Sequence, residues 1–333
     1  MFQSASFAAE APCRAEPLRL RVRFAGEAPR DALLESLQPS GLRLLDSQSR
    51  EQIWSGGPGP ATTQQIAGMD SSIGASLVAV HLDTDGIHDR IYAGDRSGRL
   101  WRLELRTGAK KTSWVEATML ADLGVTGGGR GFVAKPDVSR IEAPSGAWLN
   151  IAIGTANTGE PRNDHRFYVL RDSMAAGPGN PLVETDLELL LPPAGISRGN
   201  SRGYYLALGS AQVLAQALTL NGRIHFTAVE SARNLLTACA SNALPAMDAP
   251  LSVTVLRAKD GELESEYSGD GNAGSSSLRR PLAGSWPATT GVELATSVDA
   301  TGHVPCVIGV ETLPGCFLDT RPKRSWWRRE DAD

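Results

Sequence analysis

The sequence of 333 residues has no long hydrophobic run, and none of its apolar stretches approaches the length of a transmembrane helix. It has 4 cysteines and no Cys-x-x-Cys pair, which argues against a zinc ribbon or a thioredoxin-type dithiol. The 5 histidines form no His-x-x-x-His or His-Glu-x-x-His motif. The formal net charge of -4 lacks the basic excess of a nucleic-acid-binding surface. We therefore expect neither a membrane span nor a nucleic-acid partner.

Glycine and proline, by contrast, are abundant, with 35 Gly and 20 Pro spread along the chain. This distribution favours many turns between short strands over long helices. Hydrophobic residues make up 41% of the chain, an ordinary share for a packed domain. We expect an N-terminal segment, residues 1–40, with one strand at Leu18–Phe24 and a short helix at Asp31–Leu37. Residues 41–333 would form the main all-β domain.

The most informative stretch runs from residue 75 to residue 114. Ser76–Val80 is apolar and β-branched enough for a buried strand, and Arg90–Gly94 predicts a second strand. Asp95–Gly98 has the residue types of a hairpin turn, which Asp95 would stabilise. Arg99–Leu105 then alternates strictly, so that Trp101, Leu103 and Leu105 share one face of a strand.

The loop between the first two of these strands, residues 81–89, has the spacing of a calcium loop. With Gly86 at position 6 of an EF-hand-type loop, Asp83 and Asp85 fall at positions 3 and 5, and Asp89 falls at position 9. Ile87 would contribute its backbone carbonyl at position 7. Position 1 is His81, a poor ligand for a hard cation, and the bidentate Glu of a full EF-hand is missing. The alternative is an Asp-rich turn that needs no metal.

A weak internal repeat accompanies this loop. In three places a strand is followed by a polar turn and then by an aromatic residue: Leu42…Asp46…Trp54, Leu100…Gly108…Trp114 and Val253…Gly261…Tyr267. The pattern is similar to the blade motif of quinoprotein-type propellers, in which each blade is a small sheet covered by its neighbours. The tryptophans would pack between blades. Chance recurrence of hairpins in an all-β protein is the alternative.

Several segments together resemble a known family. They are Asp83–Arg102, Phe132–Asp137, Ile151–Thr155 with Phe167–Asp172, Arg202–Leu206, Gly222–Thr227 followed by Cys239, and Arg324–Glu330. In this order they resemble the C-terminal β-propeller of the PilY/PilC family of type IV pilus tip adhesins and pilus biogenesis proteins. The resemblance covers about residues 41 to 330. It departs from the family at His81, which replaces the first calcium Asp, and at Ala156-Asn157, where the family usually has Gly-Arg.

The resemblance implies an all-β, propeller-like fold with quinoprotein-type blades, whose number stays open. It also implies a binding protein without catalysis, in which a calcium loop affects pilus extension, twitching motility and attachment. Asp83, Asp85 and Asp89 would supply side-chain oxygens to Ca²⁺, and Ile87 a carbonyl oxygen. Minor pilins, or a host or abiotic surface, would be the partners.

The same resemblance places the protein in the periplasm or on the cell surface. Residues 1–13 show no basic segment followed by an apolar core, so the chain itself displays no signal peptide. The large N-terminal region of such adhesins is absent, and we expect the chain to be the end of a longer protein or a truncated paralogue.

Two other classes compete with this interpretation. A quinoprotein (PQQ-type) enzyme would use the same blades, but it needs an acidic base beside calcium, and the sequence offers no second acidic cluster. A metal-free propeller for protein interactions is the third possibility. The polar loop Asn157–Asp164 is a candidate ligand surface, because loops of this kind line one face of a propeller.

Three further features complete the sequence-based expectations. Cys306 and Cys316 flank a strand and a turn and could form a local disulfide in an oxidising compartment, whereas Cys13 and Cys239 give no way to choose a pairing. Leu182–Leu191 alternates acids and leucines as a short edge strand would. The glycine-rich run at 124–131 lacks the Gly-Lys-Ser/Thr ending of a phosphate loop.

Overall fold

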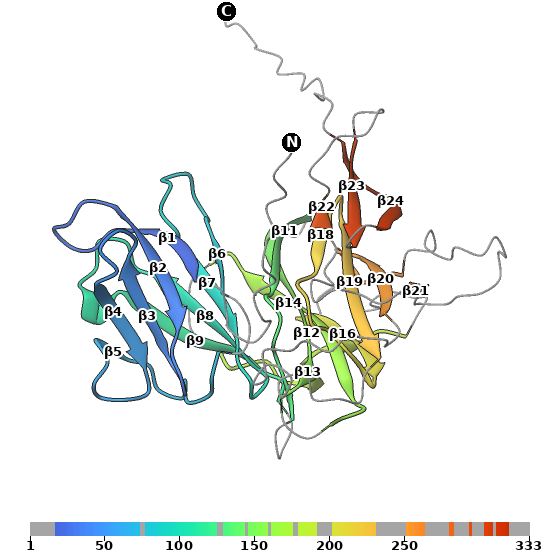
Figure 1. The fold of residues 1–333 in the computed structure, drawn as a ribbon, viewed down its shortest axis with the longest axis horizontal. Helices are drawn as coiled ribbons and strands as arrows, with labels where there is room; N and C mark the ends of the chain where they lie inside the picture. Colours follow the sequence, from blue (N-terminus) through green and yellow to red (C-terminus); the bar gives the residue numbers. More distant parts are fainter. Residues whose placement is uncertain are drawn as a thin grey trace, which may run out of the picture.

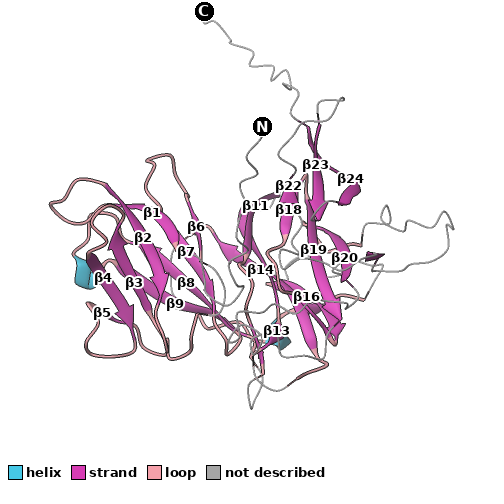
Figure 2. Cartoon of the chain, viewed as in Figure 1, coloured by secondary structure: helices cyan, strands magenta, loops and turns pink. Residues whose placement is uncertain are grey.

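The fold is described from a computed structural model of the chain. The structure describes residues 17–73, 77–124, 129–143, 146–158, 161–175, 179–191, 202–230, 251–263, 280–282, 293–294, 303–308 and 311–319. These residues form strands and turns almost throughout (Figure 2). The helical segments among them are two single 3₁₀ turns, η1 (Lys111–Ser113) and η2 (Glu184–Asp186). In the part of the chain that is described, no helix has the length and apolar character needed to cross a membrane.

The first sheet has five strands in chain order: β1 (Leu18–Val22), β2 (Arg30–Ser36), β3 (Leu42–Asp46), β4 (Gln52–Gly57) and β5 (Gln64–Gln65). The helix predicted at Asp31–Leu37 is wrong, because this segment is strand β2, paired with β1 on one side and β3 on the other. Pairing on both edges overrides the helical propensity of a short segment. The expected boundary between residues 40 and 41 therefore falls inside a sheet.

The second sheet has the order β6-β7-β8-β9, and all its pairs are antiparallel. Its strands are β6 (Val78–Val80), β7 (Arg90–Gly94), β8 (Arg99–Leu105) and β9 (Val115–Asp122). The predicted strands of this region are confirmed, and residues 74–76 lie outside the described residues.

The third sheet has the order β11-β12-β14-β16-β15. Its strands are β11 (Asp137–Ala143), β12 (Gly146–Gly154), β14 (His165–Ser173), β16 (Gly203–Gly209) and β15 (Glu188–Leu189). The edge strand predicted within Leu182–Leu191 is confirmed as β15, which is two residues long and pairs parallel to β16. A separate antiparallel pair joins β10 (Arg130–Gly131) to β13 (Ala156–Asn157).

The fourth and fifth sheets contain the remaining strands. The fourth has the order β17-β19-β20-β21, with β18 also paired to β19, and the fifth has the order β22-β23-β24. The strands are β17 (Ala211–Gln212), β18 (Leu218–Leu220), β19 (Arg223–Glu230), β20 (Leu251–Arg257), β21 (Arg280–Leu282), β22 (Glu293–Leu294), β23 (His303–Ile308) and β24 (Glu311–Asp319).

The first four sheets pack in succession and share hydrophobic cores (Figure 1). One core cluster joins the first and second sheets, another joins the second and third, and a further cluster joins the third and fourth. The second and third sheets are thus covered on both faces by their neighbours, as blades are in a propeller. The prediction of an all-β, propeller-like fold is confirmed.

Two of the repeated tryptophans meet where the first and second sheets pack. Trp54 and Trp114 are both fully buried and stand edge to face, with ring centroids 5.1 Å apart. Phe24 adds a third ring, 5.2 Å from Trp114. Gly108 has a φ of 75° in the turn that leads to Trp114, a conformation that glycine adopts without strain. The predicted packing of tryptophan between blades is confirmed at these two positions, and Tyr267 lies outside the described residues.

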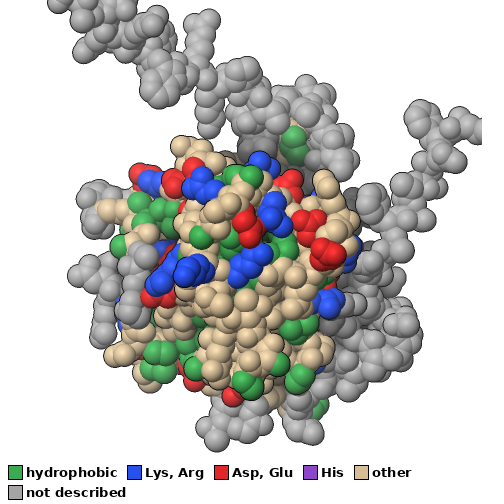
Figure 3. Space-filling model, turned by 90° about the vertical axis from the view of Figure 1, so that its left-hand side faces the viewer, with side chains coloured by type: hydrophobic (Ala, Val, Ile, Leu, Met, Phe, Trp, Pro, Cys, Tyr) green, Lys and Arg blue, Asp and Glu red, His purple; other side chains and the backbone are tan. Residues whose placement is uncertain are grey.

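The outward face of the first sheet is polar. Lys and Arg side chains are interspersed with Asp and Glu on this side of the molecule (Figure 3). Arg21 pairs with Asp31 at 3.1 Å, and Arg43 pairs with Glu35 at 2.8 Å. Charges of both signs therefore alternate on this face, and no single-sign patch covers it.

Candidate functional site: the acidic loop and the polar clusters around it

The acidic loop, residues 81–89, connects β6 to β7. Gly86 has a φ of 76°, which permits the sharp turn at position 6. Asp83 Oδ1 accepts a hydrogen bond from the backbone N–H of Asp85 at 3.0 Å, and Asp85 Oδ1 accepts one from the N–H of Ile87 at 2.7 Å. Two consecutive Asx turns thus build the loop from its own carboxylates.

The two ends of the loop are tied together by two further hydrogen bonds. Asp89 Oδ2 accepts from the backbone N–H of Leu82 at 2.6 Å. The Nδ1 atom of His81 lies 2.9 Å from the carbonyl oxygen of Ile87. Because a carbonyl only accepts, His81 is the donor and carries its proton on Nδ1. The residue at position 1 therefore donates to the carbonyl that was predicted as the ligand at position 7.

His88 fastens the loop to the first sheet. Its Nδ1 accepts a hydrogen bond from the backbone N–H of Arg21 at 3.1 Å, and its own N–H donates to the Arg21 carbonyl at 3.2 Å. The rings of His81 and His88 stack with centroids 4.1 Å apart. Burial, and then the neighbouring His81, lower the pKa of His88 below its ordinary value. A neutral His88 is what this contact with β1 requires, because its Nδ1 is the acceptor.

The predicted ligands Asp83, Asp85, Ile87 and Asp89 thus come together in one loop, and their donor chemistry fits a hard cation. Asp83 and Asp85 are exposed, while Ile87 is buried. The three carboxylates do not converge, however. Among the described residues, no group of three or more His, Cys, Asp or Glu side chains is placed to hold a metal ion. In this arrangement each predicted oxygen ligand accepts a hydrogen bond within the loop.

Asp95 has the structural role that was predicted for it. It is fully buried, and its Oδ1 accepts from the backbone N–H groups of Ser97 at 2.9 Å and Arg99 at 3.0 Å. Its Oδ2 accepts from Arg99 Nε at 2.8 Å and from Trp101 Nε1 at 3.1 Å. With both oxygens occupied, Asp95 stabilises its hairpin.

A buried ion cluster, which sequence reasoning missed, lies between the second and third sheets. Asp172 Oδ2 accepts from Arg90 Nη1 at 3.1 Å and from the Tyr92 hydroxyl at 2.6 Å, and its Oδ1 accepts from Arg102 Nη1 at 2.7 Å. Glu104 pairs with Arg90 at 2.8 Å and with Arg102 at 3.2 Å. Two arginines and two carboxylates leave no net charge. Alternation along β8 was visible in the sequence, but it did not reveal that Asp172, far along the chain, would cover the charged face of this strand.

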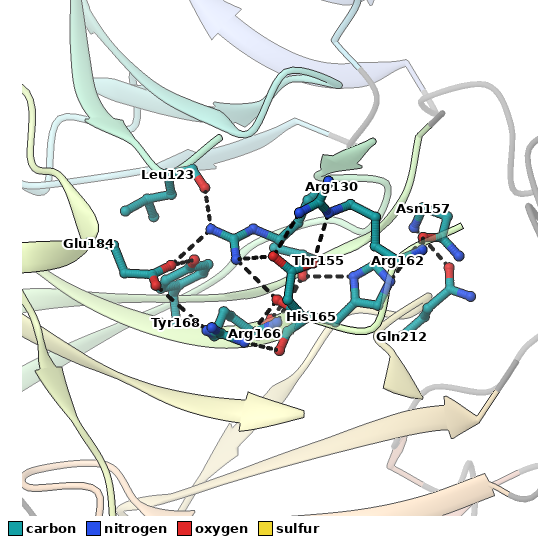
Figure 4. A network of polar contacts seen from close by, with 11 residues as sticks. Leu123, Arg130, Thr155, Asn157, Arg162, His165, Arg166, Tyr168, Glu184 and Gln212 are labelled. Carbon is teal, nitrogen blue, oxygen red and sulfur yellow. Dashed lines mark hydrogen bonds and ion pairs between the residues drawn. The ribbon is translucent and has the colours of Figure 1, made fainter. Parts of the chain in front are cut away.

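The polar loop predicted as a ligand surface contributes Asn157 and Arg162 to a second polar network, which is centred on a buried histidine (Figure 4). His165 is fully buried, with Nε2 3.0 Å from Asn157 Oδ1 and Nδ1 3.2 Å from Thr155 Oγ1. Asn157 Oδ1 also accepts a hydrogen bond from the backbone N–H of Arg162 at 2.9 Å, which identifies this atom as the amide oxygen. Because an amide oxygen only accepts, His165 Nε2 carries the proton that it donates to Asn157. Burial lowers the pKa of His165 to about 4, and the charges of Arg130, Arg162 and Arg166 add to this. His165 is therefore a neutral structural side chain.

Arg130 connects this network to the neighbouring segments. Its guanidinium donates to the Leu123 carbonyl at 3.0 Å, to the Asp164 carbonyl at 3.0 Å and to Glu184 at 2.8 Å. The Tyr168 hydroxyl donates to the same Glu184 at 2.6 Å. Burial, as the largest cause, raises the pKa of Tyr168 above its ordinary value, so the phenol keeps its proton. These contacts hold the loop in place.

A Gly-x-Ser-x-Gly pattern occurs twice in the sequence, at residues 195–199 and 199–203. In a hydrolase this motif joins a strand to a helix and presents the serine at the turn. Here the second pattern leads directly into strand β16, which begins at Gly203, and so lacks that context. Ser197 and Ser201 themselves lie outside the described residues.

The fold of this chain is similar to that of a solved pilus protein domain. The C-terminal domain of PilY1 from Pseudomonas aeruginosa superposes with a TM-score of 0.63 over 92% of this chain and 72% of that chain, at 14% sequence identity. The chain has the fold of the PilY1 C-terminal domain. The family resemblance predicted from the motifs is thereby confirmed at the level of the fold.

A quinohemoprotein alcohol dehydrogenase from Comamonas testosteroni has a TM-score of 0.40, with 12% identity, over 87% of this chain and 42% of that one, which is too low to carry an argument. No protein-family model and no curated protein sequence matches the chain.

Proposed function

We propose that this chain is a non-catalytic binding domain of the type IV pilus system, which acts in pilus assembly or at the pilus tip. The observation that carries the proposal is the shared fold with the PilY1 C-terminal domain over 92% of the chain. The acidic loop supports the proposal, because the segment Asp83–Arg102 is the most specific part of the family resemblance. In the structure this segment belongs to one unit, the antiparallel second sheet. The partners would be minor pilins or the surface to which the pilus attaches.

The finer part of the proposal is that the acidic loop binds Ca²⁺ weakly. Asp83, Asp85 and Asp89 would supply carboxylate oxygens and Ile87 a carbonyl oxygen, which are the ligands that Ca²⁺ prefers. The exposed carboxylates of Asp83 and Asp85 are free to turn out of their Asx turns, at the cost of two hydrogen bonds. When bound, the ion would neutralise the repulsion among the three carboxylates. In this proposal the loop would affect pilus extension, twitching motility and attachment.

Calorimetric titration of the purified chain with Ca²⁺ tests the metal part directly. We expect saturable binding in the millimolar range, lost in Asp85→Ala, with an unchanged circular dichroism spectrum. Asp46→Ala is a matched control, because Asp46 also accepts two backbone N–H groups in a turn but lies in the first sheet. Equal titration curves for the parent and Asp85→Ala would refute these ligands.

The pilus part needs a separate test in the source organism. Deletion of the gene should reduce twitching and the amount of surface pili, and the chain should copurify with sheared pili. Restoration by the parent gene but not by Asp85→Ala would connect the loop to this role. Normal piliation and twitching after deletion would count against the pilus proposal itself.

A further inference from the structure

A cavity of about 340 Å³ opens between the second and third sheets, beside the buried ion cluster. One wall is strand β9, with Met119 and Leu120, and the other is the end of strand β14, with Asp172. Asn180 and Arg202 complete it from the segments that follow β14 and precede β16. The volume lies in the range of pockets that hold small organic molecules. Neither the acidic loop nor the network around His165 contributes to its lining.

The floor of this cavity contains charged side chains whose charges cancel within the buried ion cluster. Arg102 and Asp172 both line it, and their side chains are only 6% and 4% exposed. The carboxylate of Asp172 already accepts hydrogen bonds from Arg90, Arg102 and Tyr92. Burial, as the largest cause, raises the pKa of Tyr92, so its hydroxyl keeps the proton that it donates. Asp172 is therefore compensated within the protein and offers little repulsion to a second anion.

The charge that remains around the cavity is positive. Its lining holds three arginines, Arg102, Arg171 and Arg202, against one acid, Asp172. The guanidinium of Arg171 packs over Trp148 at 4.9 Å and donates to the Lys259 carbonyl at 2.8 Å, so its charge acts from the cavity wall. Arg202 is the exposed arginine of the lining. With the floor neutralised, and with Asp260 and Glu188 acting on the charge of Arg171, Arg202 is the main source of positive potential at the cavity.

We infer that this cavity binds a small organic anion, with a carboxylate or phosphate group at Arg202 and an apolar part along Met119 and Leu120. An arginine fork matches the planar geometry of a carboxylate and also binds phosphate. The polar side chains of Thr118, Ser173 and Asn180 in the lining offer hydrogen bonds to the rest of the ligand. This inference does not depend on the proposed pilus function or on calcium.

Thermal-shift and calorimetric titrations with sodium succinate and with glycerol 3-phosphate test the inference and distinguish the two anionic groups. Sodium chloride at matched ionic strength corrects for general salt effects. We expect saturable binding of one or both anions to the full chain, weakened at least tenfold in Arg202→Glu. Arg19→Glu is the matched control, since Arg19 is also exposed but lies on β1 in the first sheet. That variant should bind as the parent does.

Methionine methyl NMR localises the binding independently of affinity. With ¹³C-methyl-labelled methionine, the signal of Met119, assigned with Met119→Leu, should shift on titration, while that of Met69, buried in the core of the first and second sheets, should not. Two results would overturn the inference. One is that neither anion saturates beyond the chloride control, and the other is that binding is equal in the parent and Arg202→Glu with no shift of Met119.

Discussion

His81 is the residue that most sharply separates this loop from a calcium loop. Its Nδ1–H donates to the Ile87 carbonyl, and so connects positions 1 and 7 of the loop by a hydrogen bond. In an EF-hand-type loop both of these positions contribute oxygen atoms to the ion. The imidazole thus removes one oxygen ligand and occupies a second.

Replacing His81 should therefore strengthen calcium binding. In His81→Asp a further carboxylate becomes available and the Ile87 carbonyl is released, so we expect the affinity for Ca²⁺ to rise at least tenfold, or about 1.4 kcal/mol. His81→Ala releases the carbonyl without adding a ligand and serves as the control in the same calorimetric titration. If the two variants bind Ca²⁺ with equal affinity, a carboxylate at residue 81 does not coordinate the ion.

His165 should make the stability of the protein dependent on pH. Its pKa is about 4 in the folded protein, below the ordinary value of 6.5, so between these values the unfolded chain binds a proton that the native chain does not. The stabilising contribution of neutral His165 is complete above pH 6.5 and is lost as the pH falls to about 4.

Urea unfolding at pH 7.5, 5.5 and 4.5 measures this effect. Because Asp164 and three arginines also face His165, the parent must be compared with His165→Gln, which keeps hydrogen-bonding capacity but does not titrate. We expect the midpoint to fall more steeply with decreasing pH in the parent than in the variant. Parallel pH profiles would show that His165 does not titrate on unfolding in this range.

At the scale of elements, strand β2 shows where local patterns fail. Asp31–Leu37 has helix-forming residues, but in the sheet Glu35 is only 6% exposed and accepts from Arg43 on β3 and from Arg50. Partners of this kind become available only after the sheet has formed. Strand β8, in contrast, was predicted well because strict alternation is a local property.

The two cysteines predicted to form a disulfide, Cys306 and Cys316, lie in the hairpin of β23 and β24. Pro305 pairs with Phe317, so Cys306 and Cys316, the next residues inward, lie on adjacent strands at a register shift.

We expect a Cys306–Cys316 disulfide when the protein is made in an oxidising compartment, which would stabilise the hairpin by about 3 kcal/mol. Mass spectrometry of peptides from the non-reduced protein should find the two cysteines linked, and Cys306→Ser with Cys316→Ser should lower the unfolding midpoint. Cys13 and Cys239 lie outside the described residues, and Cys239→Ser is the control. Full alkylation of Cys306 and Cys316 without a reductant would contradict the pairing.

At the scale of the whole molecule, stability depends on sheets that share their cores. Trp114 lies between the first and second sheets, against Trp54 and Phe24. Trp114→Ala would leave a cavity there, and we expect a loss of about 3–5 kcal/mol in the free energy of unfolding.

Urea denaturation of Trp114→Ala checks this value, with Leu191→Ala as the control, since Leu191 is 71% exposed and should change stability by less than about 0.5 kcal/mol. A loss below about 1 kcal/mol in Trp114→Ala would mean that the two sheets are stabilised independently of each other.

The sequence alone determined the features that depend on neighbours along the chain. The alternation of β8, the turn at Asp95, the Asx spacing of the acidic loop and the recurrent tryptophans are all local. The recurrent tryptophans favoured a propeller-like fold, and the family resemblance implied it. The tertiary structure decided what depends on distant partners. Asp172 meets Arg90 and Arg102, His88 meets Arg21, and Arg130 meets Glu184 only because separate sheets pack together. A buried charge requires a partner, and the sequence alone does not reveal which distant residue provides it.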